Sequence, residues 1–261
     1  TEHPLDLDVR EKISLFGNVP IESVVEVRDV KHTIYEVPLK LHEERLDDNV
    51  CRLLNLTTPQ PDLTRWLSFV QRVIHPTHHV RIGVVGKYIE LQDAYKSIYE
   101  ALTHAGAAND CKVDIVRVDA ESIEKAGPEL YLAGLQGILI PGGFGDRGTE
   151  GKITSARYAR EKGIPYFGVC LGMQIAVIEF ARNVCGLKDA TSTEFDKTTP
   201  HPVISLMEEQ KKVKQLGGTM RLGSWVTDLV PGSKAYELYH SATITERHRH
   251  RFEFNSDYKE M

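Results

Sequence analysis

The chain has 261 residues, of which 41% are hydrophobic, and its 32 basic and 37 acidic side chains give a formal net charge of −5. This length suffices for about two domains or one large α/β domain, and the acidic balance argues against nucleic acid or an anionic membrane as a partner. Four cysteines without a C-x-x-C spacing favour a reducing, cytoplasmic compartment. Because the sequence has no signal-peptide pattern and no apolar run of about 18 residues, we expect no membrane span.

The first part of the chain is predicted to be mostly helical. It starts at Thr1 without an initiator Met, so we expect a fragment of a longer protein. Helices are predicted at residues 8–16, 43–54 and 63–73, with a short strand at residues 24–27. The third helix has apolar residues at i, i+3, i+4 and i+7, and two prolines exclude continuous helix just before it.

Residues 75–79 contain three histidines and a proline and separate this part from the rest. Three histidines suggest a metal site, but no cysteine or carboxylate lies at ligand spacing, so a solvated linker is the better interpretation. We therefore place a domain boundary after His79, which gives the segments 1–79 and 80–261.

From residue 80 onward, predicted strands and helices alternate regularly. The strands are expected at residues 80–86, 112–118, 136–140 and 164–169, and the helices at residues 94–107 (capped by Asp93), 121–132 and 149–162. This alternation predicts an α/β fold with a mostly parallel sheet flanked by helices. Ligands bind such sheets at the carboxyl ends of the strands.

A single cysteine follows the fourth predicted strand. Gly168, Cys170 and Gly172 form a Gly-x-Cys-x-Gly pattern that leads into an amphipathic run at residues 174–181. This strand–turn–helix pattern is a nucleophile elbow with Cys in place of Ser; the helix N-terminus favours the thiolate, and the N–H of Leu171 is placed to stabilise an oxyanion. A buried structural cysteine is the commoner role in general, but the two glycines favour a nucleophile.

The glycine-rich loop after the third strand allows two interpretations. Residues 143–148 match G-x-G-x-x-G, and Glu161 lies at a plausible distance for a dinucleotide site. Such a fingerprint normally follows the first strand of the fold, not the third. A loop whose N–H groups face Cys170, and which forms the second half of an oxyanion hole, explains the glycines better.

Beyond the elbow helix the pattern becomes less regular. We expect a loop at residues 192–195, a strand at 203–207, a charged solvated turn at 208–214 and a glycine-rich strand pair or bend at 216–223. Arginine and histidine alternate within residues 246–253, which indicates either an anion-binding site or an exposed strand face.

The elbow at residues 168–174 resembles the cysteine-dependent class I glutamine amidotransferases. Stretches similar to the CTP synthase family within this group lie at residues 86–89, 141–151, 192–195, 217–223 and 246–253. The opening of the chain, at residues 4–6, 11–16 and 28–30, resembles the tail of that family's synthetase domain. The resemblance implies a flavodoxin-like amidotransferase fold, with residues 1–79 as the synthetase tail and linker. Residues 80–261 would then be an amidotransferase domain incomplete at its C-terminus.

The resemblance also implies a reaction. Glutamine is hydrolysed through a γ-glutamyl thioester on Cys170, and ammonia passes to the chain's own synthetase domain, where ATP activates UTP for amination to CTP. No cofactor is implied for the amidotransferase domain; ATP, Mg²⁺ and UTP belong to the synthetase domain, whose phosphate-binding loop and magnesium carboxylates are expected upstream of Thr1, and GTP is the activator. The implied assembly is a cytoplasmic homotetramer without nucleic acid or membrane partners.

Individual residues take their roles from the same resemblance. The oxyanion N–H groups are those of Gly143 and Leu171. The residues implied to contact glutamine are Gly143, Leu171, Gly172, Met173, Gln174, Glu194 and Arg251. The residues that resemble nucleotide contacts are Lys12, Arg28, Asp29 and Val30. The residues that resemble a GTP-responsive loop are Arg147, Gly148, Thr149 and Glu150. An arginine suits the glutamine carboxylate because its guanidinium can bind both oxygens, and no metal ligand is implied.

One part of the family pattern is missing, because no histidine after Cys170 is followed by Glu two residues later. We expect, first, a CTP synthase fragment whose catalytic His-x-Glu lies outside this sequence. A second hypothesis is a non-catalytic amidotransferase-like module that binds glutamine or a regulator, against which the retained thiol argues. A third is a different cysteine hydrolase that uses His248 or His250 as its base, since the thiol needs a proton acceptor.

Overall fold

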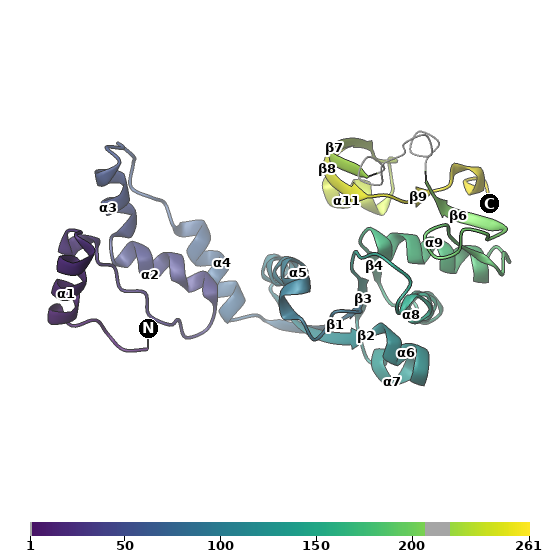
Figure 1. Ribbon diagram of the computed structural model, residues 1–261, viewed down its shortest axis with the longest axis horizontal. Helices are drawn as coiled ribbons and strands as arrows, with labels where there is room; N and C mark the ends of the chain where they lie inside the picture. The colour runs from purple at the N-terminus through teal and green to yellow at the C-terminus, as the bar shows by residue number, and fades with distance from the viewer. Residues whose placement is uncertain (1, 207–219) are drawn as a thin grey trace. The chain divides into compact units, whose positions relative to one another are not determined.

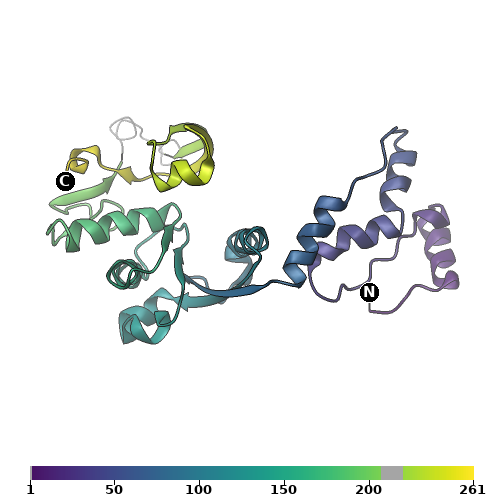
Figure 2. The same ribbon diagram turned by 180° about the vertical axis from the view of Figure 1, so that it is seen from behind.

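A computed structural model describes residues 2–206 and 220–261. The chain forms two compact units, one made of residues up to His79 with Glu100–Val113, the other of Val80–Tyr99 with Asp114–Met261. Figures 1 and 2 show the elements of each unit from opposite sides. No helix among the described residues combines the length and the apolar character needed to cross a membrane.

The first unit is built mainly from helices (Figure 1). They are α1 (Leu7–Gly17), α2 (Val37–Glu43), α3 (Leu46–Leu53) and α4 (Thr64–Ile74), with 3₁₀ turns η1 (Ile21–Ser23) and η2 (Ile34–Glu36). The predicted helices at residues 8–16 and 63–73 are confirmed. The predicted helix at residues 43–54 is wrong as one element, because Arg45 has φ 59° and separates α2 from α3.

The strand predicted at residues 24–27 is also wrong. These residues pair with no strand of the described chain. Side chains take the place of a neighbouring strand: Arg10 Nη1 donates to the Val24 carbonyl at 3.0 Å, and the Glu26 N–H donates to Glu44 Oε2 at 3.4 Å. The apolar pattern was correct for an extended segment, but a strand also needs a partner backbone.

A four-stranded sheet carries the site. Its strands are β1 (His78–Gly86), β2 (Cys111–Asp119), β3 (Gly137–Ile140) and β4 (Tyr166–Gly168), in the spatial order β2-β1-β3-β4. Strands β1 and β3, and β3 and β4, pair in parallel, which confirms the predicted fold class. Because Ile140 lies opposite Gly168, the loops that follow β3 and β4 leave the same edge of the sheet.

Helices follow these strands along the chain. They are η3 (Gln92–Tyr95), α5 (Lys96–Ala108), α6 (Ala120–Ala126), α7 (Glu129–Leu132), α8 (Thr149–Lys162) and α9 (Leu171–Asn183). Helix α8 has the predicted bounds. The helix predicted at residues 121–132 is divided after Ala126, because Gly127 with φ 81° and Pro128 interrupt it. Asp93 lies inside η3 and does not cap α5 directly.

A second sheet and a hairpin complete this unit (Figure 2). Strand β6 (His201–Ser205) lies between β5 (Ala190–Ser192) and β9 (Glu253–Phe254), parallel to β5 and antiparallel to β9. The hairpin pairs β7 (Arg221–Asp228) with β8 (Thr243–His250), and it encloses α11 (Lys234–Tyr239); the short turn η5 (Ser256–Tyr258) follows β9.

The predictions for this region are borne out in part. The predicted strand at residues 203–207 corresponds to β6, which ends at Ser205. The alternating residues 246–250 lie on β8, so the strand interpretation is correct for them. The charged turn at residues 208–214 and the first half of the predicted strand pair or bend at 216–223 lie outside the described residues; residues 221–223 of the second half belong to β7.

The core of this unit takes buried side chains from the four-stranded sheet, from α6, α7, α8 and α9, and from β5 and β6. The most completely buried large side chains include Ile138, Ile140, Leu171, Ile175 and Ile178. Leu171 follows the candidate nucleophile directly, so the first turn of α9 is anchored in this core. The position of Cys170 is therefore anchored on its helix side by a buried neighbour.

Candidate active site

Cys170 lies in a sharp turn between β4 and α9. Its φ of 53° and ψ of −104° are unusual for a residue other than glycine. A Cβ on Gly168 would lie 2.3 Å from the carbonyl carbon of Gly172, and a Cβ on Gly172 would lie 2.1 Å from the Ile140 oxygen. Both glycines are therefore required for the strand, the turn and the helix to approach so closely. This is the geometry expected of a nucleophile elbow.

The loop after β3, residues 142–148, lies against this turn. A Cβ built on Gly142 would be 3.5 Å from the Cβ of Cys170, and one built on Gly143 would be 3.4 Å from Cδ2 of Leu171. The structure thus brings together the cysteine and both residues expected to supply oxyanion N–H groups. Their proximity follows from the adjacency of β3 and β4.

The thiol of Cys170 is half-buried and lies in surroundings that favour its neutral form. Burial raises the pKa of the thiol, a hydrogen bond with the backbone of Leu171 lowers it, and the carboxylate of Glu194 raises it further. The helix N-terminus was expected to favour the thiolate, but burial outweighs that effect and raises the pKa of the thiol. Sγ donates a long bond of 4.0 Å to the carbonyl of Arg249 on β8.

The other residues expected to hold glutamine lie on or directly after α9, β5 and β8. Gln174 is buried and donates from Nε2 to the carbonyl of Phe252 at 3.0 Å. Glu194 follows β5 and accepts the N–H of Gly145 on Oε1 at 2.8 Å. Arg251 comes directly after β8, next to Phe252, and is half-buried, whereas Met173 on α9 is 42% exposed. Gln174 and Glu194 are thus both engaged by other parts of the protein.

The expected GTP-responsive loop leads into α8. Arg147 pairs with Glu121 at 3.0 Å and donates to the Lys87 carbonyl at 2.8 Å. Gly148 has φ 71° and precedes the first residue of α8, Thr149, which is buried. Glu150 pairs with Arg182 at 2.9 Å. Arg147 and Glu150 are thus held by other parts of the same unit.

Two histidines of β8 lie close to the site. His248 Nδ1 and His250 Nε2 are 2.8 Å apart, and Nδ1 of His250 is 3.7 Å from Glu253 Oε1. Burial lowers the pKa of His250, which favours a neutral imidazole. The contact that joins Cys170 to this strand is with the Arg249 carbonyl, so the thiol is paired with a backbone oxygen and not with an imidazole.

A class-I glutamine amidotransferase family model matches residues 90–261, which include this entire site. The chain belongs to the class-I glutamine amidotransferases. A second family model, CTP synthase N-terminus, matches residues 1–56.

Similar proteins agree with this membership. The CTP synthase of Carboxydothermus hydrogenoformans is 55% identical over 261 residues, which are all of this chain and 49% of that protein. The CTP synthase of Methanocaldococcus jannaschii is 54% identical over 267 residues, again with all of this chain and 49% of the relative. The glutaminase domain of Trypanosoma brucei CTPS, solved with bound acivicin, is 42% identical, with a TM-score of 0.65 over 69% of this chain and 70% of that one. The chain spans about half the length of the curated relatives it matches.

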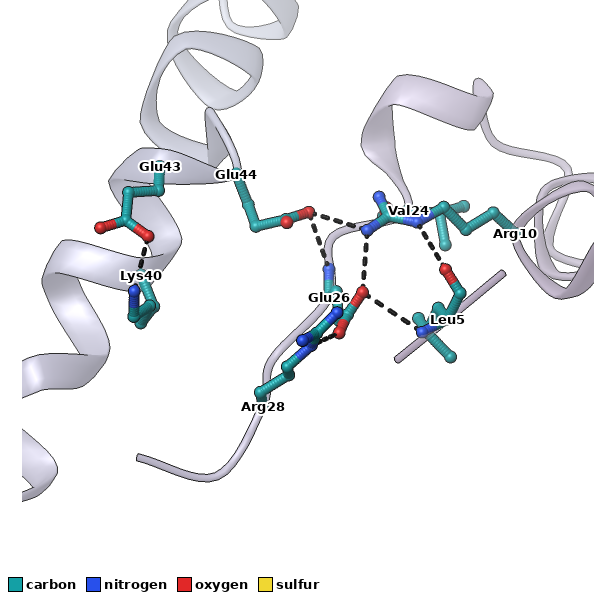
Figure 3. A network of polar contacts seen from close by, with 8 residues as sticks. All are labelled: Leu5, Arg10, Val24, Glu26, Arg28, Lys40, Glu43 and Glu44. Atoms are coloured by element: carbon teal, nitrogen blue, oxygen red, sulfur yellow. Dashed lines mark hydrogen bonds and ion pairs between the residues drawn. The ribbon is translucent and has the colours of Figure 1, made fainter. Parts of the chain in front are cut away.

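The residues that resemble nucleotide contacts lie in the first unit of this amidotransferase chain. Lys12 on α1, and Arg28 and Asp29 after the extended segment, are exposed, and Val30 is half-buried. Figure 3 shows the polar network beside them, in which the buried carboxylate of Glu26 bonds to Arg28. The described residues contain no group of three or more His, Cys, Asp or Glu that could hold a metal ion.

Arg10 connects this network to its surroundings. It bonds to Glu26 at 3.1 Å and to Glu44 at 3.0 Å, so it joins α1 to the extended segment and to the end of α2 (Figure 3). The Leu5 N–H donates to Glu26 at 3.2 Å. Sequence reasoning missed this network, since nothing in the local pattern of residues 10, 26 and 44 signals their contact.

Two lysines near the glycine-rich loop were also missed. Lys87 lies in the stretch at residues 86–89, which is similar to the CTP synthase family, and this similarity could have marked Lys87 as a functional residue. Lys152 lies on α8 and is 2% exposed. Lysine is almost never fully buried unless it is paired, so its residue type pointed to the surface.

Proposed function

We propose that this amidotransferase hydrolyses L-glutamine at Cys170. The observation that carries the proposal is the position of the thiol in a left-handed turn against Gly142 and Gly143, within the segment matched by the family model. Sulfur would attack the carboxamide carbon, and the N–H groups of Gly143 and Leu171 would stabilise the oxyanion. The C–N bond then breaks as the nitrogen takes up a proton and leaves as ammonia. Water finally cleaves the C–S bond of the thioester to give glutamate.

The amino-acid end of glutamine would lie between β5 and the end of β8. Glu194 would accept the α-amino group on the oxygen that does not bind Gly145, and Arg251 would bind the α-carboxylate with its guanidinium. Gly172, Met173 and Gln174 would line the same pocket. Because acivicin is bound to the similar glutaminase domain, we expect acivicin to compete with glutamine here.

The proton acceptor for the thiol is not assigned by the contacts of Cys170. Our leading proposal is that the His-x-Glu of the family supplies it from outside this sequence. His248 and His250 are the alternatives within it, because they flank the residue whose carbonyl contacts the thiol. Replacement of His250 by alanine would abolish turnover if His250 is the base. Intact turnover in that variant would leave His248 open, and intact turnover after substitution of both histidines would discard the alternative.

We further propose that the ammonia serves CTP formation. The support is the CTP synthase N-terminus match at residues 1–56 and the identity to CTP synthases over the full chain. Residues 1–79 would be the tail of a synthetase domain plus a linker, and residues 80–261 the amidotransferase domain. Lys12, Arg28, Asp29 and Val30 would contact ATP or UTP, the loop at residues 147–150 would respond to GTP, and the assembly would be a cytoplasmic homotetramer.

The experiment that tests the glutaminase proposal is labelling with a glutamine-like diazo-ketone, followed by mass spectrometry of the Cys170 peptide. We expect one label per chain, blocked by glutamine and absent from the Cys170→Ala variant. Labelling without hydrolysis would indicate a formed pocket whose base lies elsewhere. Absence of labelling in a folded chain would contradict the proposal and favour the non-catalytic module that binds glutamine or a regulator.

A further inference from the structure

The 142–148 loop is held by side chains from outside it. Lys87, directly after β1, donates from Nζ to the carbonyl of Phe144. On the other side of the same peptide group, the N–H of Gly145 donates to Glu194 at 2.8 Å. This peptide plane is therefore fixed at both of its polar ends.

Lys152 holds the far end of the same loop. It lies in the first turn of α8, and its Nζ donates to the carbonyl of Arg147 at 3.0 Å. On its other side the loop lies close to α6, because a Cβ built on Gly148 would be 2.9 Å from the Cβ of Ala120. Lys152 is 2% exposed, so it is as buried as a core residue. A charged group buried in this way needs a hydrogen-bonding or oppositely charged partner.

The charges that face Lys152 come from each element packed around it. Lys87 and Arg147 are the positive neighbours, and Glu124 on α6 and Asp119 at the end of β2 are the negative ones. Both carboxylates also serve the backbone: Glu124 accepts the Gly151 N–H at 3.0 Å, and Asp119 accepts the Ser122 N–H at 3.0 Å. Burial first, and then the charge of Lys87, lower the pKa of Lys152 to about 8.

We propose that Lys152 is a positioning residue for the reaction at Cys170: its buried ammonium fixes the Arg147 carbonyl and thereby holds the 142–148 loop, and with it Gly143, against the thiol. The proposal rests on the glutaminase function proposed above. It assigns a task to a buried lysine that contacts neither the thiol nor the residues expected to bind glutamine.

The lowered pKa of Lys152 decides how loop positioning and fold stability change with pH. Below pH 8 the ammonium is charged and holds the carbonyl by a charge-assisted bond, which is stronger than a neutral one. Between about pH 8 and the ordinary lysine pKa near 10.4 the folded protein binds fewer protons than the unfolded chain, so this group makes the fold more stable as pH rises. Loop positioning and fold stability therefore change in opposite directions across pH 8.

Because loop positioning and fold stability change in opposite directions, an experiment can distinguish a positioning role of Lys152 from a purely structural one. Lys152→Met keeps the length of the side chain and removes the charge, and Lys188→Met, at an exposed lysine, is the matched control. We would measure the rate of diazo-ketone labelling at Cys170 from pH 6.5 to 9.5 and the denaturation midpoint of each protein. We expect labelling of Lys152→Met to be about 10- to 100-fold slower than wild type at pH 7, with an equal or higher midpoint. Lys188→Met should match wild type in both.

The pH profile supplies the second criterion. The ratio of wild-type to Lys152→Met labelling cancels the ionisation of the thiol, which both proteins share. We expect this ratio to be constant below pH 8 and to fall towards one above it. Equal labelling rates at all pH values, or a midpoint that falls together with the rate, would overturn the positioning role. A wild-type chain that is not labelled at all would instead refute the glutaminase function, and the positioning role with it.

Discussion

Gly172→Ala should destabilise the amidotransferase unit, although alanine is the better helix former. Gly172 lies in α9, where alanine would gain up to about 1 kcal/mol from helix propensity. Against this, the new methyl group would lie 2.1 Å from the carbonyl oxygen of Ile140, which is fully buried in β3 and accepts the Val169 N–H at 3.0 Å. Relief of the clash must shift the helix or strain this bond, at a cost of about 3–5 kcal/mol from overpacking and a weakened hydrogen bond. The net loss should be about 2–4 kcal/mol.

The assay is urea denaturation followed by circular dichroism. Gly17→Ala is the matched control, since Gly17 is also helical but a Cβ there would meet only Val19 Cγ2, at 3.6 Å. The Gly172→Ala midpoint should fall at an unchanged slope, and that of Gly17→Ala should not fall. A Gly172→Ala protein as stable as wild type would show that the helix does not approach β3 as closely as described, and that the steric argument for both elbow glycines is wrong.

Three further outcomes follow from the contacts. Cys170→Ala in a longer protein that makes CTP should abolish glutamine-driven synthesis and leave ammonia-driven synthesis near wild type. Glu26→Gln should flatten the acid dependence of stability: the bond from Arg28 holds the pKa of Glu26 at about 2, so this carboxylate stabilises the fold above its unfolded pKa near 4.5 and loses that effect as pH falls towards 2. Arg160→Ala should lower the melting temperature clearly, because it leaves the buried carboxylate of Glu179 without the arginine that binds it at 2.8 Å.

Each of these outcomes has a comparison that can contradict it. Equal loss of both CTP-forming activities would make Cys170 structural. A Glu26→Gln protein with the acid profile of wild type would remove Glu26 from the acid response. For Arg160, the matched variant is Arg157→Ala, which removes an exposed i,i+4 pair with Glu161; such pairs contribute little, so similar melting temperatures of the two variants would contradict the buried-carboxylate argument.

The sheet and its helices could be predicted where the signal was local. The buried apolar runs at β1 and β3 and the helical pattern of α8 gave their positions, because burial on both faces leaves a nearly continuous apolar strand. The break at Arg45 could not be placed, since a positive φ at a residue other than glycine in a polar segment leaves no periodic trace. The break at Gly127 did have a local signal, because Gly-Pro is typical of a turn. The segment at residues 24–27 failed for a different reason: strand propensity says nothing of whether a partner backbone is available.

Some features of the candidate site could likewise be predicted from the sequence, and others could not. Cys170, Gly143 and Leu171 could be brought together from the sequence because they follow adjacent parallel strands. The contact between the thiol and the Arg249 carbonyl joins residues 79 positions apart, and only the tertiary fold provides it. The burial of Lys152 contradicts what its residue type alone suggests, and it depends on how α6, α8 and the loop pack together.

The double engagement of Glu194 has a thermodynamic consequence. One oxygen of this carboxylate accepts the Gly145 N–H, and the other is the one proposed to accept the amino group of glutamine. Loop ordering and glutamine binding would then both depend on the orientation of the Glu194 side chain. Each would therefore change the free energy of the other by the same amount. Glutamine would order the loop that stabilises its own transition state, and any effector that shifts the loop would change glutamine affinity through Glu194 without touching the substrate.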